Sequence, residues 1–486
     1  DPDVIRVEDT YYMVSTTMHF MPGCEILQSF DLVHWEHVTY VYETLDHTDA
    51  QQLKSGHNIY GQGMWAASLR YHEGRFYICF VANDTRKTYL YTSEKIDGPW
   101  KKQLIEGFYH DGSLLFDEDG RNYIVYGNDE IWITELNEDL TAPKKDGLHR
   151  LLVSDHKNPE LGYEGSHIQK INGYYYIFLV HSLRDRWMRT EACFYSDSLE
   201  GEFTGGDVLC DDRGYCGQGV AQGGIVDTPD GKWYAMLFQD SGAVGRIPIL
   251  LPVTWKDHFP VFGQNGHVPE EIEVHSTRPG YIYQPLVGSD DFCNGLLPRW
   301  QFNHDPDPRY YHLDALQGTY TITTREVCTE LTQAVNTLTQ RMSYPSCAAE
   351  VTVDASALKE GDVAGLCALQ GCYAAVGITK HHGKYEVLML DKKEDGILDM
   401  TEGTVVESHQ MDFRLEADFC NMKDEARCYY RVNKGDWLPI GTVHKLYFKL
   451  DHFTGCRFGL FCYAAEETGG SACFRDFKYY DVDEIS

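Results

Sequence analysis

Five segments in the first half of the chain repeat one pattern of apolar and polar positions. Each has a short apolar run, a polar turn that often ends in Gly, paired aromatic positions and a second apolar run. They are VIRVEDTYYMVS, SLRYHEGRFYICF, LLFDEDGRNYIVYG, IQKINGYYYIFLV and GIVDTPDGKWYAMLF. β-formers on both sides of an Asp, Asn or Gly turn are typical of β-hairpins. The pattern therefore predicts five related hairpins.

The spacing of these hairpins indicates how they assemble. The second aromatic residue of each pair falls at Tyr12, Tyr77, Tyr123, Tyr176 and Tyr234. Intervals of this length match a four-stranded propeller blade of roughly 40–60 residues. We therefore expect residues 1–287 to form an all-β, five-bladed β-propeller, whose closed ring leaves no exposed sheet edge.

The second half of the chain shows short alternating strands, such as TYTITT, CAAEVTVDA, KYEVLMLD and CRFGLFCYA. Turns separate them at intervals typical of a β-sandwich, which we expect over residues 288–486. Before it, PVFGQNGHVPEEIEVHSTRPG reads as a linker or wrapping strap. The sandwich could bind sugar, brace the propeller or close one end of a pocket. Its Gly-rich loops HFTGCRFG and EETGGSACF are the best placed to reach across, although plain hairpin turns are the favoured interpretation.

Aligning the five repeats brings out the residue that enters the first strand of each. These residues are Asp1, Trp65, Asp111, Glu164 and Gln222. The innermost strands of a propeller line its axis, so equivalent positions lie in a ring. The alignment therefore predicts three acids and a tryptophan at one mouth of the propeller.

A single Asp before Pro2 or Gly112 would read as a turn residue. Three acids gathered in one ring repel one another, so a fold would not collect them for stability. Glycosidic hydrolysis needs such a group, with one carboxyl as acid and another as base or nucleophile. Trp65 would supply an apolar wall for the sugar, and no cofactor is needed. The alternatives are a non-catalytic carbohydrate-binding propeller, which would not need three acids, and a protein-interaction scaffold.

The net charge indicates which classes of partner to exclude, and the cysteine content indicates which cellular compartment to expect. A formal charge of −32 repels phosphate backbones and anionic lipid, so we expect neither nucleic acid nor a membrane as a partner. The charge is compatible with a neutral substrate, such as the small oligosaccharide that the ring of acids suggests. The 15 cysteines show no disulfide or zinc spacing and favour the cytoplasm, with secretion after signal-peptide removal as an alternative. A homo-oligomer is compatible with the sequence. Because a functional carboxylate at residue 1 would lie at a frayed end, we expect upstream residues to hold Asp1 in the complete protein.

The same motifs resemble glycoside hydrolase family 43. The matching segments are DPDVIRV, MWAASLRYHEGRFY, HDGSLLFDEDG, EGSHIQKINGYYY, QGGIVDTPDGKWYAMLF and GAVGRIPILLPVTW, which span most of residues 1–285. The resemblance implies a five-bladed propeller followed by a concanavalin-like β-sandwich. It also implies an inverting, exo-acting hydrolase that releases terminal L-arabinofuranose or D-xylose from plant cell-wall oligosaccharides of the arabinoxylan type. We favour α-L-arabinofuranosidase, with β-D-xylosidase as the close alternative.

The resemblance also implies roles for individual residues. Asp1 would be the general base, Glu164 the general acid, and Asp111 the residue that tunes and orients that acid. Arg246 would hydrogen-bond sugar hydroxyls or the carboxylates, with a structural ion pair as an equal alternative. His19 and Phe20 would line the pocket for the terminal sugar, with a buried structural histidine as the alternative for His19.

One position departs from the family pattern. Many members place a histidine near the axis in the fifth repeat, where this chain has Gln222. The amide oxygen of Gln222 could bind a structural Ca²⁺ in the propeller channel, directly or through water. His57, His110 and His167 lie near the motifs, but their spacing does not make a zinc site.

Overall fold

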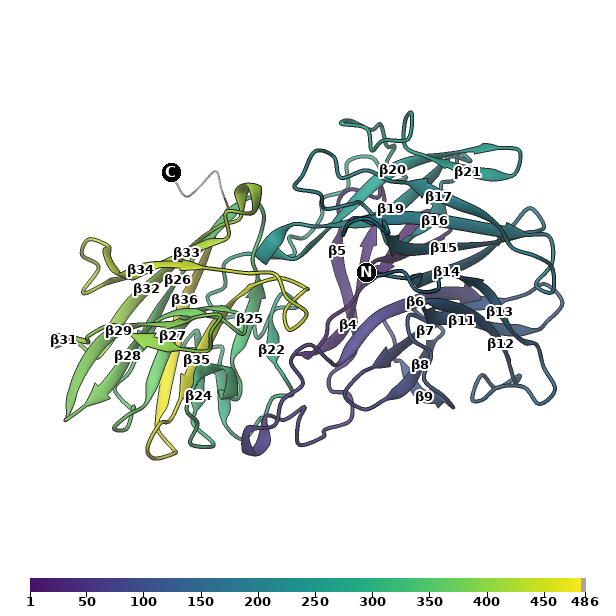
Figure 1. The fold of residues 1–486 in the computed structure, drawn as a ribbon. Helices are drawn as coiled ribbons and strands as arrows, with labels where there is room; N and C mark the ends of the chain where they lie inside the picture. The colour runs from purple at the N-terminus through teal and green to yellow at the C-terminus, as the bar shows by residue number, and fades with distance from the viewer. Residues whose placement is uncertain (482–486) are drawn as a thin grey trace.

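The computed structural model describes residues 1–481 and consists of β-strands in two bodies (Figure 1). Short 3₁₀ turns are the helical elements, at η1 (Lys54–Gly56), η2 (Gly242–Val244), η3 (Leu331–Gln333) and η4 (Cys420–Met422). Within residues 1–481 we find no helix with the length and apolar character that crossing a membrane requires. The all-β prediction is confirmed.

The first body is a propeller of five four-stranded antiparallel blades, and each predicted hairpin forms the first two strands of a blade. Blade 1 holds β1 (Asp3–Val7), β2 (Thr10–Val14), β4 (Gly23–Ser29) and β5 (Glu36–Tyr42). Blade 2 holds β6 (Met64–His72), β7 (Arg75–Ala82), β8 (Lys87–Ser93) and β9 (Lys101–Ile105). Blade 3 holds β10 (Ser113–Phe116), β11 (Asn122–Asn128), β12 (Glu130–Leu136) and β13 (His149–Ser154).

Blades 4 and 5 complete the ring. Blade 4 holds β14 (Glu164–Ile171), β15 (Tyr174–Ser182), β16 (Arg189–Ser196) and β17 (Thr204–Leu209). Blade 5 holds β18 (Gly224–Asp227), β19 (Trp233–Asp240), β20 (Arg246–Lys256) and β21 (Phe259–Phe262). The first and last blades meet through an ion pair between Arg6 and Asp227 and through a buried apolar cluster. Packing side chains, rather than a shared strand, therefore close the ring.

The propeller axis is filled by a polar group from its inner strands. Arg70 pairs with Asp3 at 2.8 Å and donates hydrogen bonds to the carbonyl oxygens of Leu114 and Ile168. The second oxygen of Asp3 lies 3.1 Å from Nδ1 of His167. Because these contacts tie blades 1 to 4 together at the centre, the axis is not an open tube.

The second body is a sandwich of two antiparallel sheets around one apolar core. One sheet contains β22 (Gln301–Asn303), β25 (Leu338–Arg341), β27 (Val363–Leu369), β28 (Ala374–His381), β29 (Lys384–Lys392), β30 (Leu398–Met400), β31 (Thr404–Val406) and β35 (Arg457–Tyr463). The other contains β23 (Tyr311–Asp314), β24 (Thr319–Thr323), β26 (Ser346–Asp354), β32 (Gln410–Asp418), β33 (Glu425–Arg431), β34 (Leu438–Lys445) and β36 (Ser471–Asp481). The predicted β-sandwich is confirmed.

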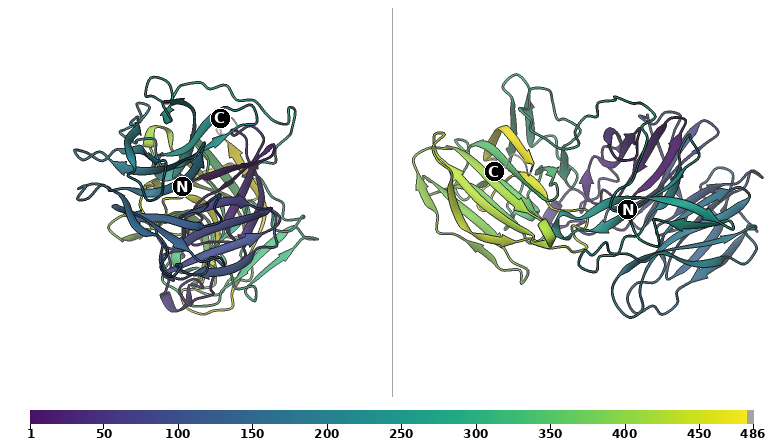
Figure 2. Two further views of the ribbon diagram at one scale, coloured as in Figure 1. Left: turned by 90° about the vertical axis from the view of Figure 1, so that its right-hand side faces the viewer. Right: turned by 90° about the horizontal axis from the view of Figure 1, so that it is seen from above.

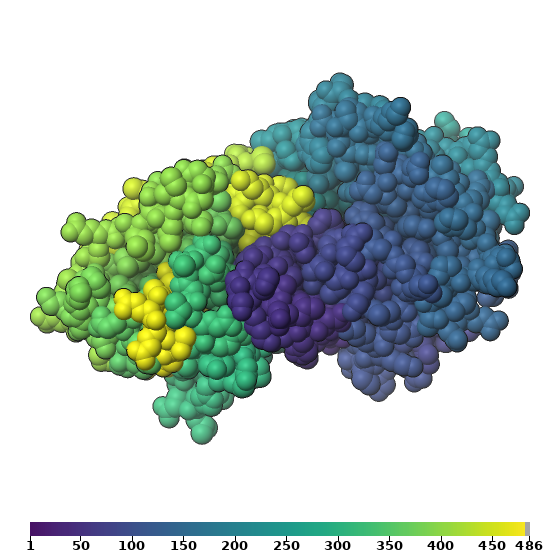
Figure 3. Space-filling model, turned by 60° about the horizontal axis from the view of Figure 1, so that its bottom comes forward, coloured from purple at the N-terminus to yellow at the C-terminus, as the bar shows by residue number. Residues whose placement is uncertain are grey.

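The two bodies are joined by more than a linker. A two-residue strand from the propeller half, β3 (Phe20–Met21), pairs with β22 and extends the first sandwich sheet. Arg341 on β25 forms an ion pair with Glu25 of blade 1 at 2.8 Å. Figure 3 shows the surface of the first blade lying directly against that of the sandwich.

Residues 263–300 connect β21 to β22 and include most of the strap predicted over residues 260–280; the whole connecting segment is called the strap (Figure 2). Thr277 donates from its backbone N–H to the carbonyl oxygen of Phe30 at 2.8 Å. Phe30 in turn donates to the hydroxyl of Tyr283 at 2.8 Å. The strap is thus fixed along blade 1 on its way to the sandwich.

Candidate active site

The structure brings the five aligned positions together at one mouth of the propeller. The backbone N–H of Gly165, next to Glu164, donates to Oδ2 of Asp111 at 3.0 Å. Gly165 has a φ of +65°, and a Cβ there would lie 2.4 Å from the amide carbon of Gln222. Two features therefore require glycine at position 165, directly after the predicted acid: its left-handed backbone conformation and the close approach of the Gln222 side chain.

Both carboxylate oxygens of Asp1 have partners. Oδ2 accepts a hydrogen bond from the hydroxyl of Thr16 at 2.5 Å. Oδ1 forms an ion pair with the guanidinium of Arg246. The carboxylate is buried and held in one orientation by a cation and a hydroxyl, which suits a group that must meet a water molecule at a fixed angle.

Arg246 is itself held on several sides. Its Nε donates to Asp240 at 3.3 Å, and Asp240 also pairs with Arg189. The guanidinium lies 4.5 Å from the ring centroid of Phe238 and 4.3 Å from that of Phe453. Burial lowers the pKa of Arg246 to about 10, against the opposite effect of the nearby acids, so it stays a cation at neutral pH. Arg246 therefore contacts one carboxylate of the aligned ring, Asp1, and also Asp240 outside it, so both interpretations of this residue, binding a site carboxylate and forming a structural ion pair, are compatible with its contacts.

Asp111 and Glu164 have different surroundings. Asp111 is buried and has a φ of +48°, a left-handed conformation that non-glycine residues seldom adopt and that recurs at functional sites. Burial raises the pKa of Asp111, and the neighbouring charge of Glu164 acts in the same direction while His110 opposes both. Glu164 is more exposed, and its Oε2 accepts a hydrogen bond from Asn128 at 2.8 Å.

His110 is a site residue that the sequence did not indicate. Its Nε2 lies 3.4 Å from Oε2 of Glu164 and 3.5 Å from Oδ2 of Asp111. Although burial lowers the pKa of His110, the charges of Asp111 and Glu164 outweigh it and raise the pKa to about 9. The sequence feature that could have pointed to His110 is its position directly before Asp111, one of the aligned acids.

The sandwich contributes an aromatic residue to the same mouth. Phe453, in the HFTGCRFG loop between β34 and β35, packs edge-to-face on Trp65 with ring centroids 5.6 Å apart and planes at 86°. The loop comes this close because Gly455 meets Gly245, where an added Cβ would lie 2.7 Å from the partner glycine. The interpretation of HFTGCRFG as a plain hairpin turn is therefore wrong. EETGGSACF does bond within the sandwich, since the N–H of Gly469 donates to the carbonyl of Thr324 at 3.1 Å.

The expectation for His19 and Phe20 needs correction. Both are fully buried between the two bodies, because the pairing of β3 carries this segment toward the sandwich. The ring of His19 packs against His304 with centroids 4.7 Å apart, and the guanidinium of Arg457 lies 3.5 Å from the Phe20 ring centroid. These residues brace the interface, and neither lines the cavity beside Asp1.

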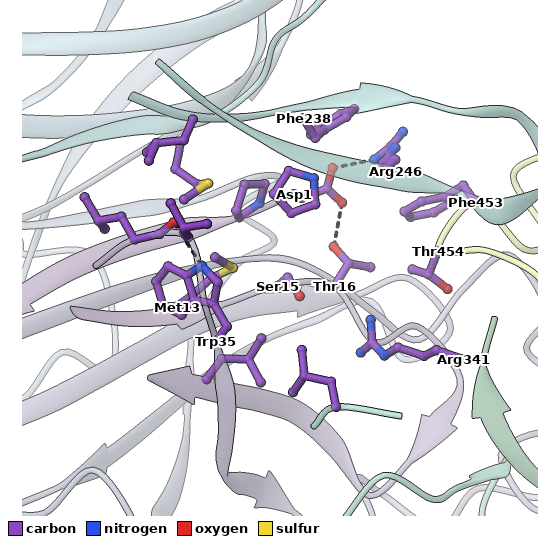
Figure 4. A pocket seen from close by; sticks show the side chains of 18 of the residues that line it. Asp1, Met13, Ser15, Thr16, Trp35, Phe238, Arg246, Arg341, Phe453 and Thr454 are labelled. Atoms are coloured by element: carbon purple, nitrogen blue, oxygen red, sulfur yellow. Dashed lines mark hydrogen bonds and ion pairs between the residues drawn. The ribbon is translucent and has the colours of Figure 1, made fainter. Parts of the chain in front are cut away.

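That cavity has a volume of about 570 Å³ (Figure 4). Asp1, Thr16, Arg246, Phe453 and Thr454 cluster at one end of it, as the close-up shows. The rest of its wall is mainly apolar and comes from blades 1 and 5 and the strap, with the charged side chain of Arg341 from the sandwich. Of the three acids only Asp1 lines it, so the cavity adjoins the catalytic ring but does not contain it.

The channel residues do not fit a calcium ion. Calcium takes six to eight oxygen ligands. The Asp3 carboxylate is already bound by Arg70, His167 and the backbone N–H of Leu69, and the Gln222 side chain packs against Gly165. Outside the group of His110, Asp111 and Glu164, no three His, Cys, Asp or Glu side chains within residues 1–481 bring donor atoms within 4.8 Å of one another.

Comparison with known proteins identifies both bodies. The family model "Glycosyl hydrolases family 43" matches residues 1–260, and "Beta xylosidase C-terminal Concanavalin A-like domain" matches residues 289–480. A solved structure described as "Bifunctional GH43-CE Bacteroides eggerthii" is 42% identical with a TM-score of 0.91, and the match covers 100% of this chain. This chain spans only 62% of the length of that longer protein.

Two curated proteins are similar over much of the chain. "Beta-xylosidase" of Formosa agariphila is 26% identical, covering 99% of this chain and 87% of the relative. "Non-reducing end alpha-L-arabinofuranosidase BoGH43B" of Bacteroides ovatus is 25% identical, covering 65% of this chain and 62% of the relative. With a family model across more than half of its residues, this chain belongs to glycosyl hydrolase family 43 and is a glycosidase.

Proposed function

We propose that this glycosidase acts by inversion and removes terminal L-arabinofuranose or D-xylose from plant cell-wall oligosaccharides. The observation that carries the proposal is the pair of differently held acids at one propeller mouth. Asp1 is bound by a cation and a hydroxyl, which favours a charged base. Glu164 is partly exposed and lies beside a second carboxyl, Asp111, which favours an acid that exchanges protons with solvent.

The reaction follows from these positions. Asp1 accepts a proton from a water molecule that attacks the anomeric carbon. Glu164 donates its proton to the glycosidic oxygen as the bond from that oxygen to the anomeric carbon breaks. A single displacement of this kind inverts the configuration. Arg246 and Thr16 orient the base, and Asp111, which accepts a hydrogen bond from the backbone N–H of Gly165, has the proposed role of orienting and tuning the acid.

The wall made by Trp65 and Phe453 supports action at a chain end. The two rings stand against each other at the mouth, so a bound chain meets protein on that side instead of passing through. Relatives named as β-xylosidase and α-L-arabinofuranosidase support both pentoses. We favour arabinofuranose, with xylose as the close alternative.

The test compares Glu164→Gln and Asp1→Asn with the unaltered protein on the methyl and the aryl glycosides of α-L-arabinofuranose and β-D-xylose. Loss of the base should lower kcat by roughly 10²–10⁴-fold on both kinds of glycoside, and loss of the acid should do so on the methyl glycosides, whose leaving group must be protonated. Glu160→Gln, an exposed glutamate nearby, is the matched control and should keep full activity. NMR of the first product should show the inverted anomer. Undiminished turnover of the methyl glycosides in either site variant, or a retained configuration, would overturn the assignment.

Other expectations remain proposals. All fifteen cysteines are free, which supports a reducing compartment such as the cytoplasm. We propose that no cofactor takes part and that neither nucleic acid nor membrane is a partner, and a homo-oligomer stays a prediction. The domain boundary at 287 and 288 also stays a prediction; it falls in the strap between β21 and β22.

A further inference from the structure

His110 lies between the carboxyl group of Glu164, which protonates the leaving-group oxygen in the proposed reaction, and the carboxyl group of Asp111. Its Nε2 is within ion-pair distance of both, at 3.4 Å from Glu164 and 3.5 Å from Asp111. Its backbone carbonyl accepts a hydrogen bond from Gly127 at 3.0 Å, which fixes the segment against β11. The imidazole is thus placed by its neighbours and is not a surface group that happens to face an acid.

Uncharged groups confine this imidazole on its other sides. The Trp65 ring on β6 lies 6.1 Å from it, and Asn128 on β11 donates to the same Glu164 oxygen that His110 faces. Among charged groups, Arg86 stacks on Phe108 and opposes protonation of His110. Arg189 on blade 4 and Arg246 on blade 5 interact electrostatically with Glu164. Two acids at contact distance therefore face His110, with arginines opposing them from farther away.

We propose that His110 is a positioning residue for the general acid, which holds one shared proton on the group of His110, Asp111 and Glu164 up to alkaline pH. The proposal rests on the proposed function, because it acts through Glu164. The proton moves from Nε2 of the imidazolium to Oε2 of the Glu164 carboxylate, which leaves a neutral imidazole and a protonated acid. Solvent water returns a proton to the group after each turnover.

The consequence is a particular pH dependence. Groups that interact strongly titrate as one unit. With one proton, the unit is an imidazolium with two carboxylates, or a neutral imidazole with the proton on Asp111 or on Glu164. Only the form with protonated Glu164 can protonate a leaving oxygen, and the ratios among the three forms do not change with pH. Activity should therefore persist until the last proton leaves, close to the pKa of His110 at about 9.

Replacing the imidazole removes the group that keeps this last proton. In His110→Asn only carboxyl groups can hold it, and carboxyl groups ordinarily lose their protons at far lower pH, near 4. The basic limb of kcat/KM should move to lower pH by more than one unit. Each pH unit between the two limbs lowers the activity of the variant a further tenfold relative to the unaltered enzyme.

The kinetic experiment measures kcat/KM from pH 4 to 10 for two glycosides of the pentose that the enzyme cleaves. The methyl glycoside has a poor leaving group and needs the acid, whereas the 4-nitrophenyl glycoside needs it little. We expect a large shift of the basic limb for the methyl glycoside and a small one for the nitrophenyl glycoside. A purely structural role would lower both rates alike at every pH. His312→Asn, an exposed histidine on the sandwich, is the control and should match the unaltered enzyme.

A second measurement does not depend on activity. NMR titration of histidines labelled at Cε1, with the His110 signal assigned by its loss in His110→Asn, should give a midpoint near pH 9. In Glu164→Gln or Asp111→Asn the midpoint should fall toward about 6.5. A midpoint near 6.5 in the unaltered protein, or coincident basic limbs, would overturn the role of His110. Full activity of Glu164→Gln on the methyl glycoside would overturn the proposed function instead.

Discussion

Replacing Phe453 with alanine removes an aromatic ring that the sandwich places at the propeller mouth. Phe453 is only 2% exposed, packs edge-to-face on Trp65 and covers one face of the Arg246 guanidinium. The variant should therefore loosen two neighbours of the reaction at once. One is the apolar wall, and the other is the cation that orients Asp1.

The expected effect follows from these two contacts. An edge-to-face aromatic pair contributes about 0.5–1.5 kcal/mol, and a cation over a ring contributes roughly 0.5–2 kcal/mol when desolvated. A loss of about 1–3 kcal/mol, expressed in the transition state, lowers kcat/KM by roughly five- to two-hundredfold, since 1.36 kcal/mol is a factor of ten. Phe453→Leu keeps apolar bulk without the ring and should fall between alanine and phenylalanine.

The assay is kcat/KM on the aryl pentosides, with thermal unfolding measured for each variant to show that the fold persists. A Phe453→Ala enzyme within twofold of the unaltered protein would refute the argument, because Trp65 and Arg246 would then keep their positions without this ring. Equal losses in Phe453→Leu and Phe453→Ala would mean that the ring itself, and not its bulk, determines the effect.

Three further outcomes are expected. Glu191 is buried with no partner for either oxygen in the described residues, and burial raises its pKa well above the usual value. The unfolded side chain loses its proton above about pH 4.3 while the folded one keeps it. Stability therefore falls by up to ~1.4 kcal/mol per pH unit until the folded carboxyl ionises. Glu191→Gln should gain thermal stability over the unaltered protein as pH rises, and a pH-independent difference in melting temperature would contradict this. Asp111→Asn should lower kcat/KM and move its basic limb to lower pH, because it removes a charge that favours proton retention; an unmoved limb would count against that role. EDTA should leave kcat/KM unchanged, since the Asp3 carboxylate in the channel is already paired; a loss restored by Ca²⁺ would show otherwise.

The repeats made most of the propeller predictable. Hairpin turns and alternating apolar positions are local signals, so all five inner hairpins could be located from the sequence. Aligning the repeats then brought out Asp1, Asp111 and Glu164, because a propeller turns equivalent positions into neighbours. The approach worked where sequence repetition carries spatial information.

The remaining site residues depend on contacts between distant segments. Phe453 meets Trp65 across almost four hundred residues of chain, through a loop whose own sequence is compatible with a simple turn. The expectation for His19 and Phe20 failed for the same reason. The two-residue strand that carries Phe20 has too short a pattern to detect, and its partner β22 begins only at residue 301. The sequence could mark His19, Phe20 and the loop that holds Phe453 as candidates, but which side chains they contact depends on the tertiary structure.

The strand β3 limits how the two halves of this protein can be recombined, in evolution or by design. Because Phe20–Met21 supplies an edge of the sandwich sheet, the boundary in the sequence is not the boundary in hydrogen bonding. The two halves are therefore not interchangeable modules: a recombination that exchanged the C-terminal half would have to recreate this pairing with a new partner. Substitutions in the MHFMPG segment are constrained by its pairing with β22 in the C-terminal half. Designed chimeras should therefore keep β3 and β22 from the same parent.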